Sequence, residues 1–290
     1  MNEVVKYNNH MNELQFKDFT DYDLNFLMVI CAKMKDLGEE TQRFEYGKLM
    51  ELLDWDKSKS VEVFHKDLKR MSEKLRHVGA TIDVDPNVFT AFNLFSDFEG
   101  DMRKRVLTVR LNPRFKYILN DLTKNFTRFE LSEYVHLDGK YAKLLYQHLK
   151  QFRRTGWWQV SVGDLRKELS IPDSMDNRKI VNKVLNPSVE LIKHCKGFGE
   201  LQVEAIRSPR RGRAVEGYKF TWTAEKQIPV QMSVDDYLKF KDGGGKAKEK
   251  GGGESGQKRQ AHPKNAANRF NQHKQREYDF DELERLLVTN

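Results

Sequence analysis

The stretch that decides the fold reads Asn177-Arg-Lys-Ile-Val-Asn-Lys-Val-Leu-Asn-Pro-Ser-Val-Glu-Leu-Ile-Lys-His194. Its apolar residues recur at helical spacing and predict a helix with one buried face, formed by Val181, Val184/Leu185 and Ile192. Pro187 lies inside this helix, and with Asn186 as a cap it is able to start a new one, so we expect a bend or a division there.

The segments around this helix complete a recognisable order. A helix at Lys140–Phe152, a strand at Trp157–Val160 and a helix at Val162–Leu169 precede it, and the turn Ser170–Ser174 leads into it. Two strands with alternating apolar residues follow it, at 201–206 and 217–223. Helix, strand, helix, turn, helix and a two-stranded hairpin with a basic tip is the winged-helix arrangement. Trp157 and Trp158 open the first strand, and we expect both in the core.

The first half of the chain repeats this plan. Helical spacing from Leu24 to Met34, with Gly38 as the stop, predicts the first helix. The remaining expected elements are a short helix at Tyr46–Leu53, a helix at Ser58–His77, and strands at Thr81–Asp85, Val88–Phe98 and Arg105–Leu111, with residues 99–104 as a turn. The fold class is therefore α+β, with two tandem winged-helix domains expected at residues 1–125 and 126–240.

The composition changes near Asp242. Residues 241–276 hold ten basic and three acidic residues with almost no aliphatic ones, which predicts a flexible basic linker. Residues 277–290 hold five acids together with Phe280, Leu283, Leu286 and Leu287, a pattern that favours a short acidic amphipathic helix. A solubilising disordered end is the alternative for this last segment.

Composition also limits the class of protein. Lys and Arg number 51 against 43 Asp and Glu, a net charge of +8 that makes polyanions the first partner to consider. No apolar run approaches the roughly 20 residues of a membrane span, and residues 1–10 are too polar for a secretory signal. Cys31 and Cys195 lie in apolar helical patterns, where reduced buried thiols are expected. These features predict a cytoplasmic protein with no membrane association.

Motifs for chemistry are absent from the sequence. No His-x-His pair is present, which argues against a rolling-circle nickase, and no Cys or His spacing is typical of zinc. Gly243-Gly-Gly-Lys246 lacks the flanking residues of a phosphate-binding loop. We therefore expect no enzyme activity, no catalytic residue, no metal and no cofactor.

Basic residues instead indicate contact with DNA. On the helix at 177–194, Arg178 and Asn182 share one line and Lys179 and Lys183 the next, and arginine and asparagine suit guanine and adenine edges in a major groove. The remaining candidates are expected to contact phosphates or the minor groove. They are Arg207, Arg210, Arg211 and Arg213 at the hairpin tip, Lys150, Arg153 and Arg154 in the acid-free stretch 139–163, and Lys59, Lys66, Lys69 and Arg70 in the first half. An ordinary solvated face is the alternative for the helix at 177–194 and for the first half, and a solubilising loop is the alternative for the hairpin tip.

With these motifs in place, the chain resembles the replication initiator (Rep) proteins of iteron-type, theta-replicating plasmids, over about residues 10–230. The resemblance is carried by residues 125–130 (Asn-Phe-Thr-Arg-Phe-Glu), 140–150, 162–169 and 180–192 in this order and spacing. The portion Arg276–Glu284 is similar to the tail of initiators from Gram-positive plasmids. One departure is Glu190-Leu-Ile-Lys193, where many relatives have Glu-Ile-Asn.

The resemblance implies a fold of two tandem winged helices and a function. Such proteins bind directly repeated iterons in double-stranded origin DNA as monomers, often dimerise through the first winged helix and repress their own promoter. They help to open the origin and recruit host initiator, helicase or polymerase factors. By the family pattern, the helix at 177–194 is the main base-reading element. The alternatives are a winged-helix transcriptional repressor without initiator activity and a protein-interaction scaffold that depends on the acidic tail.

Overall fold

A computed structural model describes residues 3–35, 37, 41–85, 87–120, 122, 125–209 and 214–225. These residues belong to one compact unit, Met1–Ile228. The expected basic linker at 241–276 and the acidic segment at 277–290 lie outside the described residues. In the part of the chain that is described, no helix combines the length and apolar character needed to cross a membrane.

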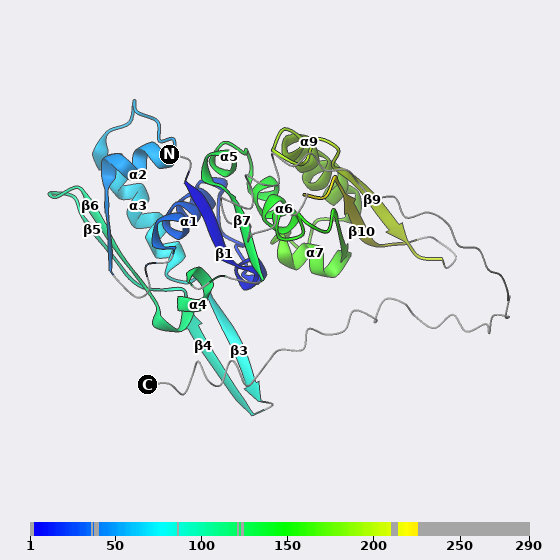
Figure 1. The fold of residues 1–290 in the computed structure, drawn as a ribbon, viewed down its shortest axis with the longest axis horizontal. Helices are drawn as coiled ribbons and strands as arrows, with labels where there is room; N and C mark the ends of the chain where they lie inside the picture. Colours follow the sequence, from blue (N-terminus) through cyan, green and yellow to red (C-terminus); the bar gives the residue numbers. More distant parts are fainter. Residues whose placement is uncertain are drawn as a thin grey trace, which may run out of the picture. The chain divides into compact units, whose positions relative to one another are not determined.

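The second half of this unit is a winged helix (Figure 1). Its elements are α6 (Lys140–Gln151), β8 (Trp157–Ser161), α7 (Val162–Glu168), the helix made of α8 (Asn177–Lys179), η3 (Ile180–Leu185) and α9 (Asn186–Lys193), then β9 (Gln202–Arg207) and β10 (Val215–Thr221). The three strands are antiparallel in the order β8-β10-β9. The first strand of the module thus pairs with its last, and the hairpin forms the wing.

The first half has the same topology. Its elements are α1 (Asp21–Met34), β2 (Gln42–Glu45), α2 (Tyr46–Leu52), α3 (Val61–Leu75), β5 (Phe95–Asp101) and β6 (Val106–Leu111). The sheet order β2-β6-β5 again pairs the first strand with the last. The predicted duplication is confirmed, although β2 was missed because it has only four residues and a single buried one, Phe44.

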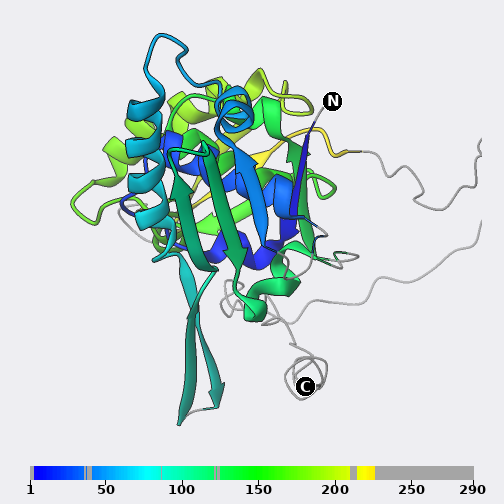
Figure 2. The same ribbon diagram turned by 90° about the vertical axis from the view of Figure 1, so that its left-hand side faces the viewer.

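An additional hairpin interrupts the first module. Strands β3 (Gly79–Asp85) and β4 (Val88–Asn93) pair only with each other, and both views show them extending away from the helices (Figures 1 and 2). The predicted single strand at 88–98 is therefore wrong. It is divided at Leu94, which is buried and donates its N–H to Val78 O over 2.7 Å. The predicted turn at 99–104 is also misplaced, because β5 continues to Asp101.

A third small sheet links the two modules. Strand β1 (Val4–Asn8) pairs antiparallel with β7 (Phe126–Glu130), which begins the second half. The remaining short elements here are η1 (Asn9–Glu13), η2 (Pro113–Phe115), α4 (Lys116–Leu119) and α5 (Leu131–Val135). Asn12 is buried and donates to Thr127 Oγ1 and to Gln151 Oε1 on α6, at 3.1 and 2.8 Å. The segment that contains β1 and Asn12 is thus hydrogen-bonded to the second half of the unit. The exact boundary between the two domains stays a prediction.

The core runs through both modules. Helix α1 is buried from Asp23 to Ala32, and α6 from Ala142 to Lys150. Cys31 and Cys195 are both buried free thiols, as expected from their apolar surroundings. Because they are buried on nearly all sides, α1 and α6 are the central helices against which the outer helices of the two modules pack.

Candidate nucleic-acid interface

The helix α8–η3–α9 presents a polar face to solvent. Asp176 begins it by accepting a hydrogen bond from Lys179 N at 2.8 Å, and this bond lowers the pKa of the Asp176 carboxyl. Ile180, Val184, Leu185 and Ile192 are buried on the inner side. All four residues predicted from the sequence as base-reading candidates are exposed, namely Arg178, Lys179, Asn182 and Lys183.

Three of these side chains make no polar contact with another described residue of the protein. Within the described ranges, no hydrogen bond or ion pair engages the polar groups of Arg178, Asn182 or Lys183, whereas Lys179 Nζ is 3.2 Å from Asp176. A guanidinium, an amide and an ammonium group are thus presented together on one exposed helix face. This set suits the hydrogen-bonding edges of bases and the phosphates beside them.

Pro187 does not divide the helix. Asn186 has helical angles (φ −58°, ψ −50°) and is not a cap, so the expected division at this point is wrong, while the expected bend stays a prediction. Instead, residues 180–185 form a π-helical turn in which Asn186 N donates to Val181 O, five residues back. Proline has no N–H to donate, and the wider turn accommodates it without ending the helix.

The wing of the second module is only partly described. Arg207 is exposed at the end of β9, and Ser208 N donates to Ala214 O at 2.8 Å, which closes the base of the loop. The predicted wing residues Arg210, Arg211 and Arg213 lie outside the described residues. Their proposed contact with DNA stays a prediction.

The predicted phosphate contact of Lys150, on the lysine-rich helix α6, requires a correction. Lys150 is buried, with Nζ 3.0 Å from Lys196 O and 3.4 Å from Glu133, and it lies over the rings of Tyr146 and Phe198. Its predicted contact with phosphate is wrong, because its ammonium is already paired in the interior. Regular spacing of lysines on a helix did not reveal that α6 is buried on nearly every side.

Of the next two arginines, Arg153 is mostly buried and paired, whereas Arg154 is exposed. The Arg153 side chain is 13% exposed, its Nε is 3.0 Å from Glu225, and its guanidinium lies over Phe126. We therefore remove Arg153 from the interface as well, since its charge is neutralised within the protein. Arg154, the next residue, is exposed and keeps its predicted role as a phosphate contact.

The first module presents a second basic surface. Lys59, Lys66 and Lys69 are exposed on or just before α3, and Lys59 Nζ lies 5.2 Å from the centre of the Trp55 ring. For Lys66 and Lys69, the described residues offer no acidic partner within ion-pair distance. These lysines are therefore available for phosphates.

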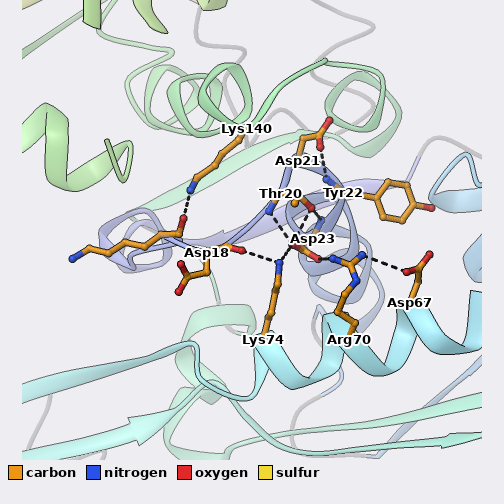
Figure 3. A network of polar contacts seen from close by, with 10 residues as sticks. Asp18, Thr20, Asp21, Tyr22, Asp23, Asp67, Arg70, Lys74 and Lys140 are labelled. Carbon is orange, nitrogen blue, oxygen red and sulfur yellow. Dashed lines mark hydrogen bonds and ion pairs between the residues drawn. The ribbon is translucent and has the colours of Figure 1, made fainter. Parts of the chain in front are cut away.

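Arg70, on the same helix, faces an acidic group of the protein (Figure 3). Its guanidinium lies 3.6 Å from Asp23 and 3.5 Å from Asp67, and the Asp23 side chain is only 1% exposed. Lys74 completes the network with Nζ 2.6 Å from Asp23. Arg70 therefore holds α3 against α1, and any DNA contact by it competes with this role.

The two tryptophans of β8 differ in burial. Trp158 is buried and stacks on His148 and Phe220, as expected, but Trp157 is 42% exposed and not part of the core. Alternation along a strand sends neighbours to opposite faces, so only one of the two is able to point inward.

Comparisons with known proteins agree with this architecture. The model described as "Initiator Replication protein, WH1" matches residues 4–150, and the one described as "Initiator Rep protein, WH2" matches residues 161–222. The chain belongs to the family of initiator replication proteins. The resemblance noted in the sequence is thereby confirmed.

A curated relative and a solved structure support this membership. The initiator is 32% identical over 226 residues to the "Probable replication protein rep" of Bifidobacterium longum (strain NCC 2705), covering 77% of this chain and 74% of the relative. It is similar in fold to a crystal structure of the Pi initiator protein in complex with iteron DNA, with a TM-score of 0.58, 14% identity, and coverage of 78% of this chain and 99% of that one. At this identity the second likeness concerns the fold.

The described part of this initiator contains no group of three or more His, Cys, Asp or Glu side chains placed to hold a metal ion. What it contains in exposed positions is a set of cations on two winged helices. The candidate interface after these corrections consists of Arg178, Lys179, Asn182, Lys183, Arg154, Arg207, Lys59, Lys66 and Lys69, together with Arg70, which also pairs with Asp23.

Proposed function

We propose that this initiator binds directly repeated sequences (iterons) in double-stranded plasmid DNA and thereby starts replication. The observation that carries the proposal is the exposed Arg178, Asn182 and Lys183 face on the helix that precedes the wing. A major groove admits one such helix, where an arginine fork matches guanine and an asparagine amide matches adenine. The fold neighbour crystallised with iteron DNA supports this choice of ligand.

The two modules have different parts in this proposal. The second reads bases through α8–η3–α9, while Arg154 and the arginines of its wing, including Arg210, Arg211 and Arg213, contact the backbone. The first contributes phosphate contacts through Lys59, Lys66 and Lys69. Phosphate contacts of this kind position a protein on the duplex and supply affinity, whereas base contacts supply specificity.

Further steps of initiation belong to the same proposal. DNA binding next to an AT-rich segment helps to open the origin, and the acidic segment at 277–290 recruits a host initiator, helicase or polymerase factor. Binding at its own promoter represses the gene, and the first module provides for a homodimer. The protein itself carries out no chemistry on DNA.

Binding to DNA tests the central claim. Affinity for a duplex with the repeats is measured against a scrambled duplex over a range of salt concentrations, for the full chain and for Arg178→Ala and Asn182→Ala. We expect each variant to lose about 1–3 kcal/mol of discrimination. Lys193→Ala is the matched control on the same helix, because Lys193 is already paired with Glu190 at 2.7 Å. Equal binding of the unchanged protein to both duplexes contradicts the proposal.

A replication assay separates initiation from repression alone. A plasmid that carries only this gene and its upstream repeats replicates if the protein is an initiator. If binding is specific but the plasmid fails to replicate in a permissive host, a transcriptional repressor is the better description.

A further inference from the structure

We propose that Asn186 is a third base-reading residue, and that the π-helical turn at 180–185 brings it into line with Arg178 and Asn182. The inference rests on the proposed DNA-binding function and deepens it. Asn186 was treated in the sequence only as a possible cap, so its position on the exposed face comes from the structure.

The burial pattern of the helix has a period of four residues. Arg178, Asn182, Asn186 and Glu190 are all exposed. The residues two positions further along each time are all buried, namely Ile180, Val184, Ser188 and Ile192. Exposure and burial therefore stay in phase over more than three turns, from one end of the helix to the other.

A regular α-helix does not keep such a pattern in phase. With 3.6 residues per turn, residues four apart are offset by about 40°, and three such steps turn the line by about 120°. That offset would carry Glu190 far from the direction of Arg178. A π-turn takes more residues per turn than an α-turn, and it therefore removes much of the offset.

The hydrogen bonds explain why the wide turn occurs here. Lys183 O lacks the donor four residues ahead, because Pro187 has no N–H. Asn186 N bonds to Val181 O, five residues back, instead of to the carbonyl of Asn182. π-turns inside α-helices are frequent at functional sites. In this helix the turn aligns one arginine and two asparagines on a single exposed line.

The chemistry of Asn186 fits base recognition. Its exposed amide has one acceptor and two donors, the set that pairs bidentately with adenine. In the described structure no hydrogen bond within the protein uses this amide. Glu190, the next residue on the line, is paired with Lys193 at 2.7 Å and is therefore not part of the reading set.

The alignment makes an ordered prediction about the DNA. Successive residues on the line are about 6 Å apart along the helix axis, which corresponds to between one and two base pairs of about 3.4 Å. The base pairs read by Arg178, Asn182 and Asn186 should consequently follow one another in that order along each repeat.

The experiment measures binding of the full chain to repeats in which each base pair is varied in turn. Asn186→Ala should change the preference by about 5- to 150-fold at a base pair of its own, next to the one affected by Asn182→Ala. Asn177→Ala is the control, since its Oδ1 lies 3.4 Å from Arg166 within the protein. An unchanged preference of Asn186→Ala at every base pair overturns the inference.

Pro187→Ala tests the role of the π-turn. Alanine restores an N–H that can bond to Lys183 O, so a regular helix rotates Arg178 and Asn182 relative to Asn186. We expect the preferences at the base pairs read by Arg178 and Asn182 to weaken by about fivefold or more, while circular dichroism shows an intact fold. The same preferences in Pro187→Ala contradict the proposed alignment. If the unchanged protein shows no base preference at all, it is the proposed function that fails, which is a different result.

Discussion

At the scale of single residues, Asp23 is a buried charge of the first module with partners on two elements. Its carboxylate accepts from Thr20 in a capping box at the start of α1 and pairs with Lys74 and Arg70 of α3 (Figure 3). A charge buried to this extent is tolerated only when it is paired and hydrogen-bonded. The network fixes α3, which carries the exposed lysines, against the central helix.

Replacing Asp23 should therefore destabilise the protein. Asp23→Ala removes the carboxylate half of the capping box and leaves Lys74 and Arg70 without their buried partner, and we expect a loss of about 3 kcal/mol in the free energy of unfolding. Chemical denaturation measures this loss. Glu51→Ala is the control, because its pair with Lys48 is exposed on both sides and should leave the denaturation midpoint unchanged. Equal midpoints for the two variants would show that the network is not stabilising.

His148 predicts a dependence of stability on pH. Burial lowers its pKa to about 4, while in the unfolded chain an imidazole titrates near 6.5. As the pH falls below about 6.5, the unfolded state takes up the proton first, so the free energy of unfolding falls until about pH 4, by about 3 kcal/mol. His148→Phe keeps a ring stacked on Trp158 and should lose this part of the slope. Denaturation of both proteins between pH 4 and 8 tests this. If the free energies of unfolding of the unchanged protein and of His148→Phe stay parallel throughout that range, the prediction is contradicted.

At the scale of elements, strand β10 of the wing lies too close to strand β8 for any side chain at Gly217. A Cβ there would lie 2.5 Å from Val160 O of the neighbouring strand, where β10 has a bulge. A Cβ added at Gly163 in α7 would have its nearest neighbour, Ser161 Oγ, at 3.8 Å. The same substitution should consequently have opposite effects at the two positions.

We expect Gly217→Ala to lower the melting temperature, because backbone must move to relieve the contact. Gly163→Ala should raise the free energy of unfolding by about 0.5–1 kcal/mol, the usual gain from replacing a helical glycine. Thermal unfolding of both variants is the measurement. A gain in stability for Gly217→Ala is the result that would show the close approach to be wrong.

Much of the helical framework was predictable from sequence, because its apolar spacing reflects one-sided burial. The helix expected at Ser58–His77 agrees with α3 to within three residues at either end, because Phe64, Leu68, Met71 and Leu75 are buried at helical spacing. The β3–β4 hairpin was not separable from β5, since nothing in an alternating pattern marks where a strand changes partners. Lys150 was mistaken for a surface charge because ion pairing in the interior depends on Glu133, a residue of another element.

At the scale of the whole molecule, the described unit contains two copies of one DNA-binding plan joined by more than a linker. Strand β1 pairs with β7, and Phe16 N donates to Ser170 Oγ at 3.0 Å, so residues before the first module are hydrogen-bonded to the second. Each copy carries exposed cations on the helix before its wing, and fewer acidic residues lie among them on the second. Two joined modules of this kind are suited to contact one stretch of DNA together.

Salt dependence of binding tests whether the first module contacts the same DNA as the second. Each phosphate neutralised by a lysine contributes about −0.9 to the slope of log affinity against log salt, so Lys66→Ala with Lys69→Ala should reduce that slope by about 1.8. Base preference should stay unchanged, because it belongs to α8–η3–α9. Lys48→Ala, already paired with Glu51 at 2.7 Å, serves as the matched control. An unaltered slope in the double variant would mean that the second module binds alone and that the lysines of α3 form an ordinary solvated face.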